Sequence, residues 1–62
     1  MKKNENNEEI EIKILSNTKN RIIVNETVYN SLAKGETIFI PRGSIYSIFN
    51  ESMEEDLIFR MK

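Results

Sequence analysis

The stretch Gly35–Asn50, GETIFIPRGSIYSIFN, decides the fold of this 62-residue chain. It holds both glycines and the only proline, set among Ile, Phe and Tyr residues that favour strands. Gly35 can adopt the positive φ of a sharp turn, and Gly43 permits the next one. Pro41 ends a strand because it has no N–H to donate to a ladder. Asn50 closes the second strand with an amide that can cap a turn. The stretch therefore predicts a strand, a corner and a strand running back.

Period-two patterns on either side of this stretch predict further strands. EIEIKIL alternates charged and branched apolar residues, as a half-buried strand does. Two short apolar runs flank Asn25-Glu26, a pair that suits a two-residue hairpin. No helical spacing persists beyond one turn, so we expect an all-β, mostly antiparallel domain of five or six strands. The expected strands are Glu9–Leu15, Ile22–Val24, Thr27–Tyr29, Thr37–Ile40, Ile45–Phe49 and Asp56–Met61.

The first eight residues, MKKNENNE, differ from the rest because no apolar residue follows Met1. Such a segment cannot offset its ordering entropy by burial. The sequence therefore predicts a flexible polar tail over residues 1–8 and a β domain over residues 9–62.

Composition narrows the ways in which so short a chain can be stabilised. A chain of this length buries only about 60% of the surface that it exposes when unfolded. It has no cysteine and no histidine, which excludes disulfides and metal sites built on those residues. The net charge of −1 gives no basic footprint for nucleic acid, and no apolar run is long enough to span a bilayer. Nothing at the N-terminus indicates secretion, so we expect an intracellular protein that self-associates.

The fixed residues of the opening stretch, G-x5-P-x-G-x2-Y-x3-N, resemble the second conserved motif of the cupin superfamily. Tyr46 stands where that motif has a metal-binding histidine, and the first cupin motif has no counterpart. The segments IFIPRGSIYSIFNES and DLIFRMK are similar to the C-terminal cupin domain of the centromere protein C family. The match runs from Arg21 to Lys62. The motif residues, to which the resemblance gives a structural role, are Gly35, Pro41, Gly43, Tyr46 and Asn50.

The resemblance implies a small or truncated cupin-type jelly roll that is completed by dimerisation. It also implies a homodimerisation module of a centromere or kinetochore protein in the nucleus. Its partners would be a second copy of itself and other kinetochore proteins. No Arg-rich, aromatic nucleosome-contacting segment precedes the domain, so nucleic-acid binding is not expected of this segment.

The residues that could carry catalysis lack their chemical partners. Without histidine, the ligand set of catalytic cupins cannot form, and Tyr46 fits a core or hydrogen-bonding role better than a metal ligand. Ser44 and Ser47 have no histidine base. The acidic run between residues 51 and 56 lacks the spacing of a calcium loop and fits a solvated turn. We expect no enzyme activity, no cofactor and no metal. The alternative function is a cupin that binds a small molecule in the barrel near Tyr46.

Strand parity leaves several apolar residues outside a one-sided core. Tyr46, Ile48 and Asn50 share one face of their strand, and the intervening residues share the other. We expect five or six strands to be too few for two full sheets in one chain, so the outward apolar residues are expected to meet a second copy. The predicted dimer interface consists of Phe39, Ile45, Phe49 and Ile58.

Overall fold

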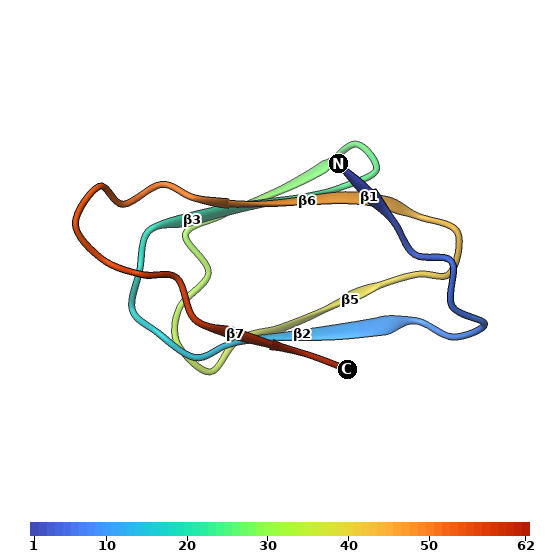
Figure 1. Ribbon diagram of the computed structural model, residues 1–62, viewed down its shortest axis with the longest axis horizontal. Helices are drawn as coiled ribbons and strands as arrows, with labels where there is room; N and C mark the ends of the chain where they lie inside the picture. The colour runs from blue at the N-terminus through green and yellow to red at the C-terminus, as the bar shows by residue number, and fades with distance from the viewer.

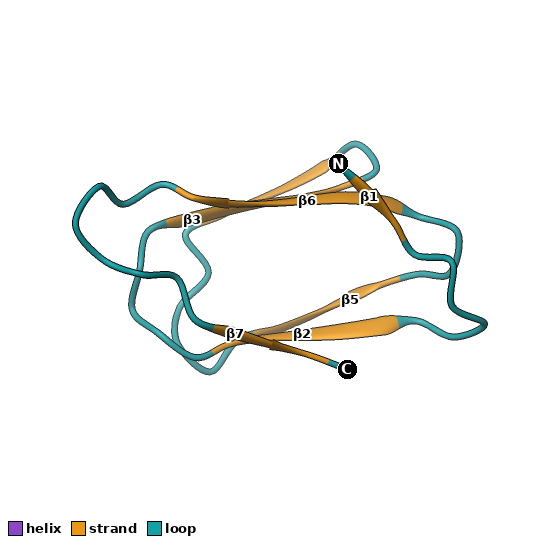
Figure 2. Ribbon diagram, viewed as in Figure 1, coloured by secondary structure: helices purple, strands orange, loops and turns teal.

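The computed structural model describes all residues from Met1 to Lys62 as seven short strands without a helix (Figure 1). The strands are antiparallel to their neighbours and form two stacked sheets, which Figure 2 shows as two layers joined by loops at both ends. One sheet has the order β1-β6-β3-β4 and the other β5-β2-β7. The all-β antiparallel prediction is confirmed. The strands are β1 (Lys2–Lys3), β2 (Ile10–Ile14), β3 (Asn20–Val24), β4 (Thr27–Asn30), β5 (Thr37–Ile40), β6 (Ile45–Asn50) and β7 (Phe59–Met61).

The chain changes sheets at almost every connection. Only the β3–β4 hairpin stays within one sheet, and every other connection crosses between the layers. The hairpin has the predicted register, with Val24 opposite Thr27, and Asn25 supplies the positive φ of its turn (53°). The corner after β5 was expected to send β6 back beside it. Instead β5 and β6 lie in different sheets, because the corner carries the chain across the sandwich.

The core lies between the two sheets and is built mainly from isoleucine. Alternate residues of β2 (Ile10, Ile12 and Ile14) are 0 to 6% exposed, as their period-two pattern predicted. They face buried residues from β3, β5 and β6. The other buried apolar residues are Ile22, Val24, Ile38, Ile40 and Tyr46.

The prediction of a flexible tail over residues 1–8 is wrong for its first half. Lys2 and Lys3 form β1 and pair with Tyr46 and Ile45 of β6. Asn4 is 1% exposed, and its side-chain Nδ2 donates to the carbonyl of Ile40 at 3.0 Å. The segment is ordered by backbone and amide hydrogen bonds, a source of stability that its lack of apolar residues does not reveal.

The expectation that one chain is too short for two sheets is also wrong. The strands are two to six residues long, and the N-terminal segment adds a strand that was not expected. The inner faces of the two sheets therefore cover each other within one chain. A second copy is not needed to supply the opposing sheet.

Candidate interaction surfaces

The glycines and the proline of the opening stretch build two tight turns. Gly35 has φ of 93° and lies in a turn in which the N–H of Glu36 donates to the carbonyl of Ala33 at 3.0 Å. Gly43 has φ of 83°, inside a turn closed by a bond from Ser44 N–H to the Pro41 carbonyl at 3.1 Å. Both glycines occupy the third position of their turn, where a positive φ is required in type II turns. These residues shape corners, as predicted.

Tyr46 lies in the core and faces inward, which fits the core role expected for it. Its side chain is 6% exposed, and its Oη lies 4.0 Å from Met61 Sδ. A residue so placed fills space between the sheets and holds the end of β7 near β6.

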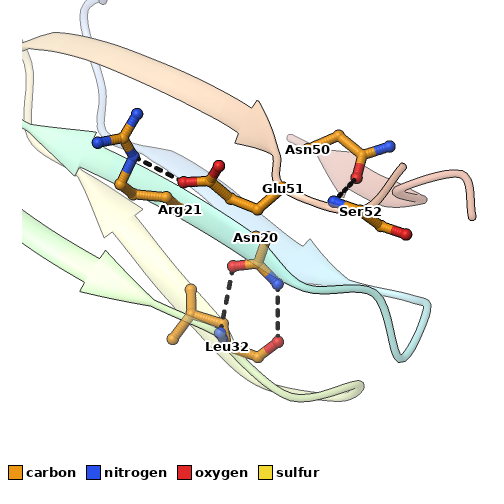
Figure 3. A network of polar contacts seen from close by, with 6 residues as sticks. All are labelled: Asn20, Arg21, Leu32, Asn50, Glu51 and Ser52. Atoms are coloured by element: carbon orange, nitrogen blue, oxygen red, sulfur yellow. Dashed lines mark hydrogen bonds and ion pairs between the residues drawn. The ribbon is translucent and has the colours of Figure 1, made fainter. Parts of the chain in front are cut away.

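Asn50 caps the turn that follows β6, as the sequence predicted. Its Oδ1 accepts from Ser52 N–H at 2.9 Å (Figure 3), and its Nδ2 donates to the Glu55 carbonyl at 2.9 Å. Ser52 Oγ accepts from the N–H groups of Glu54 and Glu55 in the same turn. The acidic segment is thus an ordered turn organised by two short polar side chains.

The four residues of the predicted dimer interface are all exposed, at 39 to 53%. They do not form one surface. Ile45 and Phe49 lie on the outer face of the four-stranded sheet, whereas Phe39 and Ile58 lie on the outer side of the three-stranded sheet. The predicted single interface is therefore wrong, because opposite sides of a sandwich cannot meet one partner surface at a two-fold axis.

The outer face of the four-stranded sheet carries a continuous apolar group, here called the apolar face. Ile23 lies directly between Ser47 and Val28 in the register of the sheet. Ile45 and Phe49 flank Ser47 along β6. Val28 and Ile45 are 49% and 45% exposed. The apolar face consists of Ile23, Val28, Ile45 and Phe49.

A charged pair borders the apolar face at the Phe49 end. The guanidinium carbon of Arg21 lies 4.6 Å from the centre of the Phe49 ring. Arg21 Nε lies 3.0 Å from Glu51 Oε1 (Figure 3), an ion pair whose N–H direction does not meet hydrogen-bond geometry. Both side chains are about 40% exposed, so solvent weakens the pair, and its main effect is to hold Arg21 over the ring.

The outer face of the three-stranded sheet is different and is here called the charged face. Glu11 lies opposite Phe39 on one side and Lys62 on the other. Lys13 lies opposite Arg60. This charged row separates Phe39 from Ile58, so the two apolar side chains stand apart.

Two buried asparagines, Asn4 and Asn20, form hydrogen bonds between distant segments and were not predicted from the sequence. Asn4 joins the β1 end of one sheet to the end of β5 in the other. Asn20 exchanges bonds with Leu32, donating to its carbonyl at 2.9 Å and accepting from its N–H at 3.1 Å (Figure 3). The signal for Asn20 was available, since it continues the inward parity of Ile22 and Val24. No pattern in the sequence marks Asn4.

A cleft opens at one side of the sandwich, between β6 and β7. Its volume is about 660 Å³. We call it the β6–β7 cleft. Its apolar lining comes from both sheets, and Lys2, Asn50 and Asp56 supply its polar groups. The apolar lining residues are Met1, Tyr46, Ile48, Phe49, Leu57, Phe59 and Met61.

The acidic residues do not gather into a metal site, since no group of three or more acidic side chains is placed to hold an ion. The chain also has no helix that is long and apolar enough to cross a membrane. Comparison with protein-family models, with curated proteins and with solved structures found no match to this chain.

Proposed function

We propose that this chain is a non-catalytic homodimerisation module. One observation carries the proposal: three adjacent strands place Ile23, Val28, Ile45 and Phe49 together on one outer sheet face. Exposed apolar groups of this kind mark interaction surfaces in small proteins. In so small a domain, covering this face would also add apolar burial that the eight-residue core lacks.

The arrangement of the apolar face favours a second copy as the partner. Ile45 and Phe49 stand two residues on either side of Ser47. A two-fold axis through Ser47 therefore places Ile45 of one copy over Phe49 of the other. Lys3 is directly opposite Ile45, and Glu51 follows the Phe49 end of β6. The same rotation brings these opposite charges toward each other at both rims.

We further propose that the module is of the cupin type found in the centromere protein C family. The motif order supports this, and so do two inward-packed sheets in which Gly35, Pro41 and Gly43 form the corners. By this proposal the chain joins two copies of a kinetochore protein in the nucleus. Other kinetochore proteins could then bind the paired module, and the module itself would not contact nucleic acid.

The proposal is tested by solution mass. Light scattering of the wild-type chain is expected to give twice the chain mass of 7.3 kDa at micromolar concentrations. Phe49→Asp places a charge within the proposed interface, opposite Ile45 of the second copy, and is expected to give a folded monomer. Phe39→Asp is the matched control, because Phe39 is also an exposed phenylalanine on a strand but lies on the charged face. It is expected to remain a dimer.

Circular dichroism verifies that each variant is folded, and Ile45→Glu provides a second disruption on the same face. A wild-type chain that stays monomeric at high concentration contradicts the proposal. So does dissociation by Phe39→Asp with no effect of Phe49→Asp.

The second candidate function is binding of a small molecule near Tyr46. The observation in its favour is that Tyr46 lines the β6–β7 cleft. Against it, the Tyr46 side chain is 6% exposed and its hydroxyl already contacts Met61, which leaves little of it for a ligand. A thermal-shift screen with sugars and small acids tests this candidate, which requires saturable stabilisation that Tyr46→Phe reduces.

A further inference from the structure

One edge of β6 is only partly paired. Asn4 N–H donates to the Ser44 carbonyl at 2.8 Å, which places the backbone groups of even-numbered residues on the β1 side of the strand. β1 reaches only as far as Tyr46. Beyond it, the N–H and C=O groups of Ile48 and Asn50 face the same edge, with no strand beside them. Two pairs of donors and acceptors are thus spaced as an added strand would need them.

The β6–β7 cleft lies directly beside this unpaired edge. Ile48 faces inward from β6, and Leu57, Phe59 and Met61 approach from the β7 side. An added strand would point alternate side chains into this space. The residue directly opposite Ile48 would therefore meet an apolar surface.

The polar residues at one end of the cleft indicate which side chain an added strand would carry opposite Asn50. Asp56 lines the cleft beside the turn that Asn50 caps through the Glu55 carbonyl. Asp56 has no ion pair, and Glu54 and Glu55 add negative charge in the same turn. A side chain opposite Asn50, which also points inward, would therefore be favoured if it carried positive charge.

We propose that the β6–β7 cleft binds an extended peptide segment of another protein by strand addition. The segment lies antiparallel to β6, in line with β1, since both present neighbours of β6 are antiparallel to it. Its residue opposite Ile48 is apolar, and the residue two positions earlier, opposite Asn50, is Lys or Arg. The recognised pattern is basic-x-apolar. Backbone bonds supply binding, and the two inward side chains supply selectivity.

An extended backbone explains features that a small molecule does not. The unpaired groups of Ile48 and Asn50 recur with the two-residue period of a strand and continue the line of an existing one. This inference rests on different groups from dimerisation, since it uses the unpaired backbone edge of β6 and the inward side chains, although Phe49 borders both the cleft and the apolar face.

The test uses an N-terminally fluorescein-labelled, C-terminally amidated probe, Gly-Gly-Lys-Thr-Ile, titrated with the full chain and followed by anisotropy. The probe ends at the residue opposite Ile48 because Lys2 of β1 already pairs with Tyr46. N-methylation of the isoleucine nitrogen removes the donor to the Ile48 carbonyl and is expected to weaken binding about tenfold. N-methylation of the preceding threonine is the matched control, because that nitrogen faces away from β6. Its expected effect is about twofold or less.

Charge reversal at Asp56 tests the preference for a basic peptide residue opposite Asn50. Asp56→Lys is expected to weaken binding of the lysine probe and to strengthen binding of a probe with Glu in its place. Glu54→Lys is the control, since Glu54 lies in the same turn but does not line the cleft. Amide chemical shifts of Ile48 and Asn50 are expected to move on peptide addition, with those of Val28 and Ile23 unchanged.

Three results would overturn the proposal. The first is the absence of saturable shifts at millimolar peptide. The second is an equal loss of affinity for the two N-methylated probes, because strand addition requires that only the isoleucine nitrogen matters. The third is a saturable response of the cleft residues to sugars or small acids, with none to the peptide.

Discussion

The two sheets of this protein are alike on their inner faces and different on their outer faces. Inside, both present alternating branched residues that pack into one core. Outside, the four-stranded sheet presents the apolar face, whereas the three-stranded sheet presents rows of Glu, Lys and Arg. A single aromatic residue stands on each outer side, Phe49 on one and Phe39 on the other, with 39% and 50% exposure.

This difference shows that exposure of a single residue does not define an interaction surface. Phe39 is the more exposed of the two, yet its cross-strand neighbour is Glu11. Phe49 is covered in part by Arg21 and lies on the same face as Ile23 and Ile45. What matters is whether neighbouring strands continue the apolar character, which depends on register.

The largest expected losses of stability come from the core, and they test whether the inner faces of the two sheets contribute equally to it. Ile12→Ala in β2 and Ile22→Ala in β3 each remove a fully buried side chain. Each is expected to lower the free energy of unfolding by about 3 kcal/mol, because the lost burial leaves a cavity. That is a large part of the roughly 3–9 kcal/mol available to a domain of this size. Urea unfolding measures both, and a loss several times larger in one sheet would show that the core is centred on that sheet.

The next largest loss of stability is expected from the hydrogen bonds by which Asn4 connects the two sheets. Asn4→Ala removes the donor to the carbonyls of Ile40 and Pro41, at 3.0 and 3.2 Å. We expect the free energy of unfolding to fall by about 2 kcal/mol, since these carbonyls lose the hydrogen bonds from the Asn4 side chain. Asn6→Ala is the control, because Asn6 is exposed and only its backbone N–H is hydrogen-bonded. If the two variants are equally stable, β1 is not fixed to the sandwich as described.

A smaller effect compares the corners that lead into the two sheets. Gly35 precedes β5 in one sheet, and Gly43 precedes β6 in the other. An added Cβ would meet no atom within 4 Å at either position. Each Gly→Ala change should therefore cost only the backbone strain of a positive φ, about 1 kcal/mol. Thermal unfolding measures this, and a much larger loss at Gly43 alone would indicate strain at the crossing between sheets.

The smallest effect concerns the border of the apolar face. Arg21→Ala removes the contact with the Phe49 ring and the ion pair with Glu51. We expect the free energy of unfolding to fall by only about 0.5 kcal/mol, since both charged side chains are solvated. High salt should reduce this difference by screening the ion pair. A loss that salt leaves unchanged would assign the contribution to the ring contact alone.

Strand positions and side-chain parity were predictable from the sequence. The period-two pattern gave the inward residues of β2 and the alternation along β5, and Asn25-Glu26 gave the hairpin. These features follow from steric preferences that act over a few residues. The pairing of β1 with β6 was not predictable, because two lysines carry no pattern and are ordered only by a strand that lies more than forty residues away.

The candidate surfaces were predictable only in part. Outward parity correctly identified the exposed residues Phe39, Ile45, Phe49 and Ile58. It could not divide them between two sides of a sandwich, since that depends on which sheet each strand joins. The β6–β7 cleft likewise arises from the early end of β1 and the approach of β7.

By itself, the sequence determined the all-β class, the turns at Gly35 and Gly43, and the alternation of side chains along the predicted strands. These are local properties, set by backbone sterics and by the alternation of strands. Only the tertiary structure decided that one chain makes both sheets, that Asn4 joins them, and that four apolar residues share one outer face. Those outcomes depend on register between distant strands, where hydrogen bonds and packing act together and no short stretch of sequence records the result.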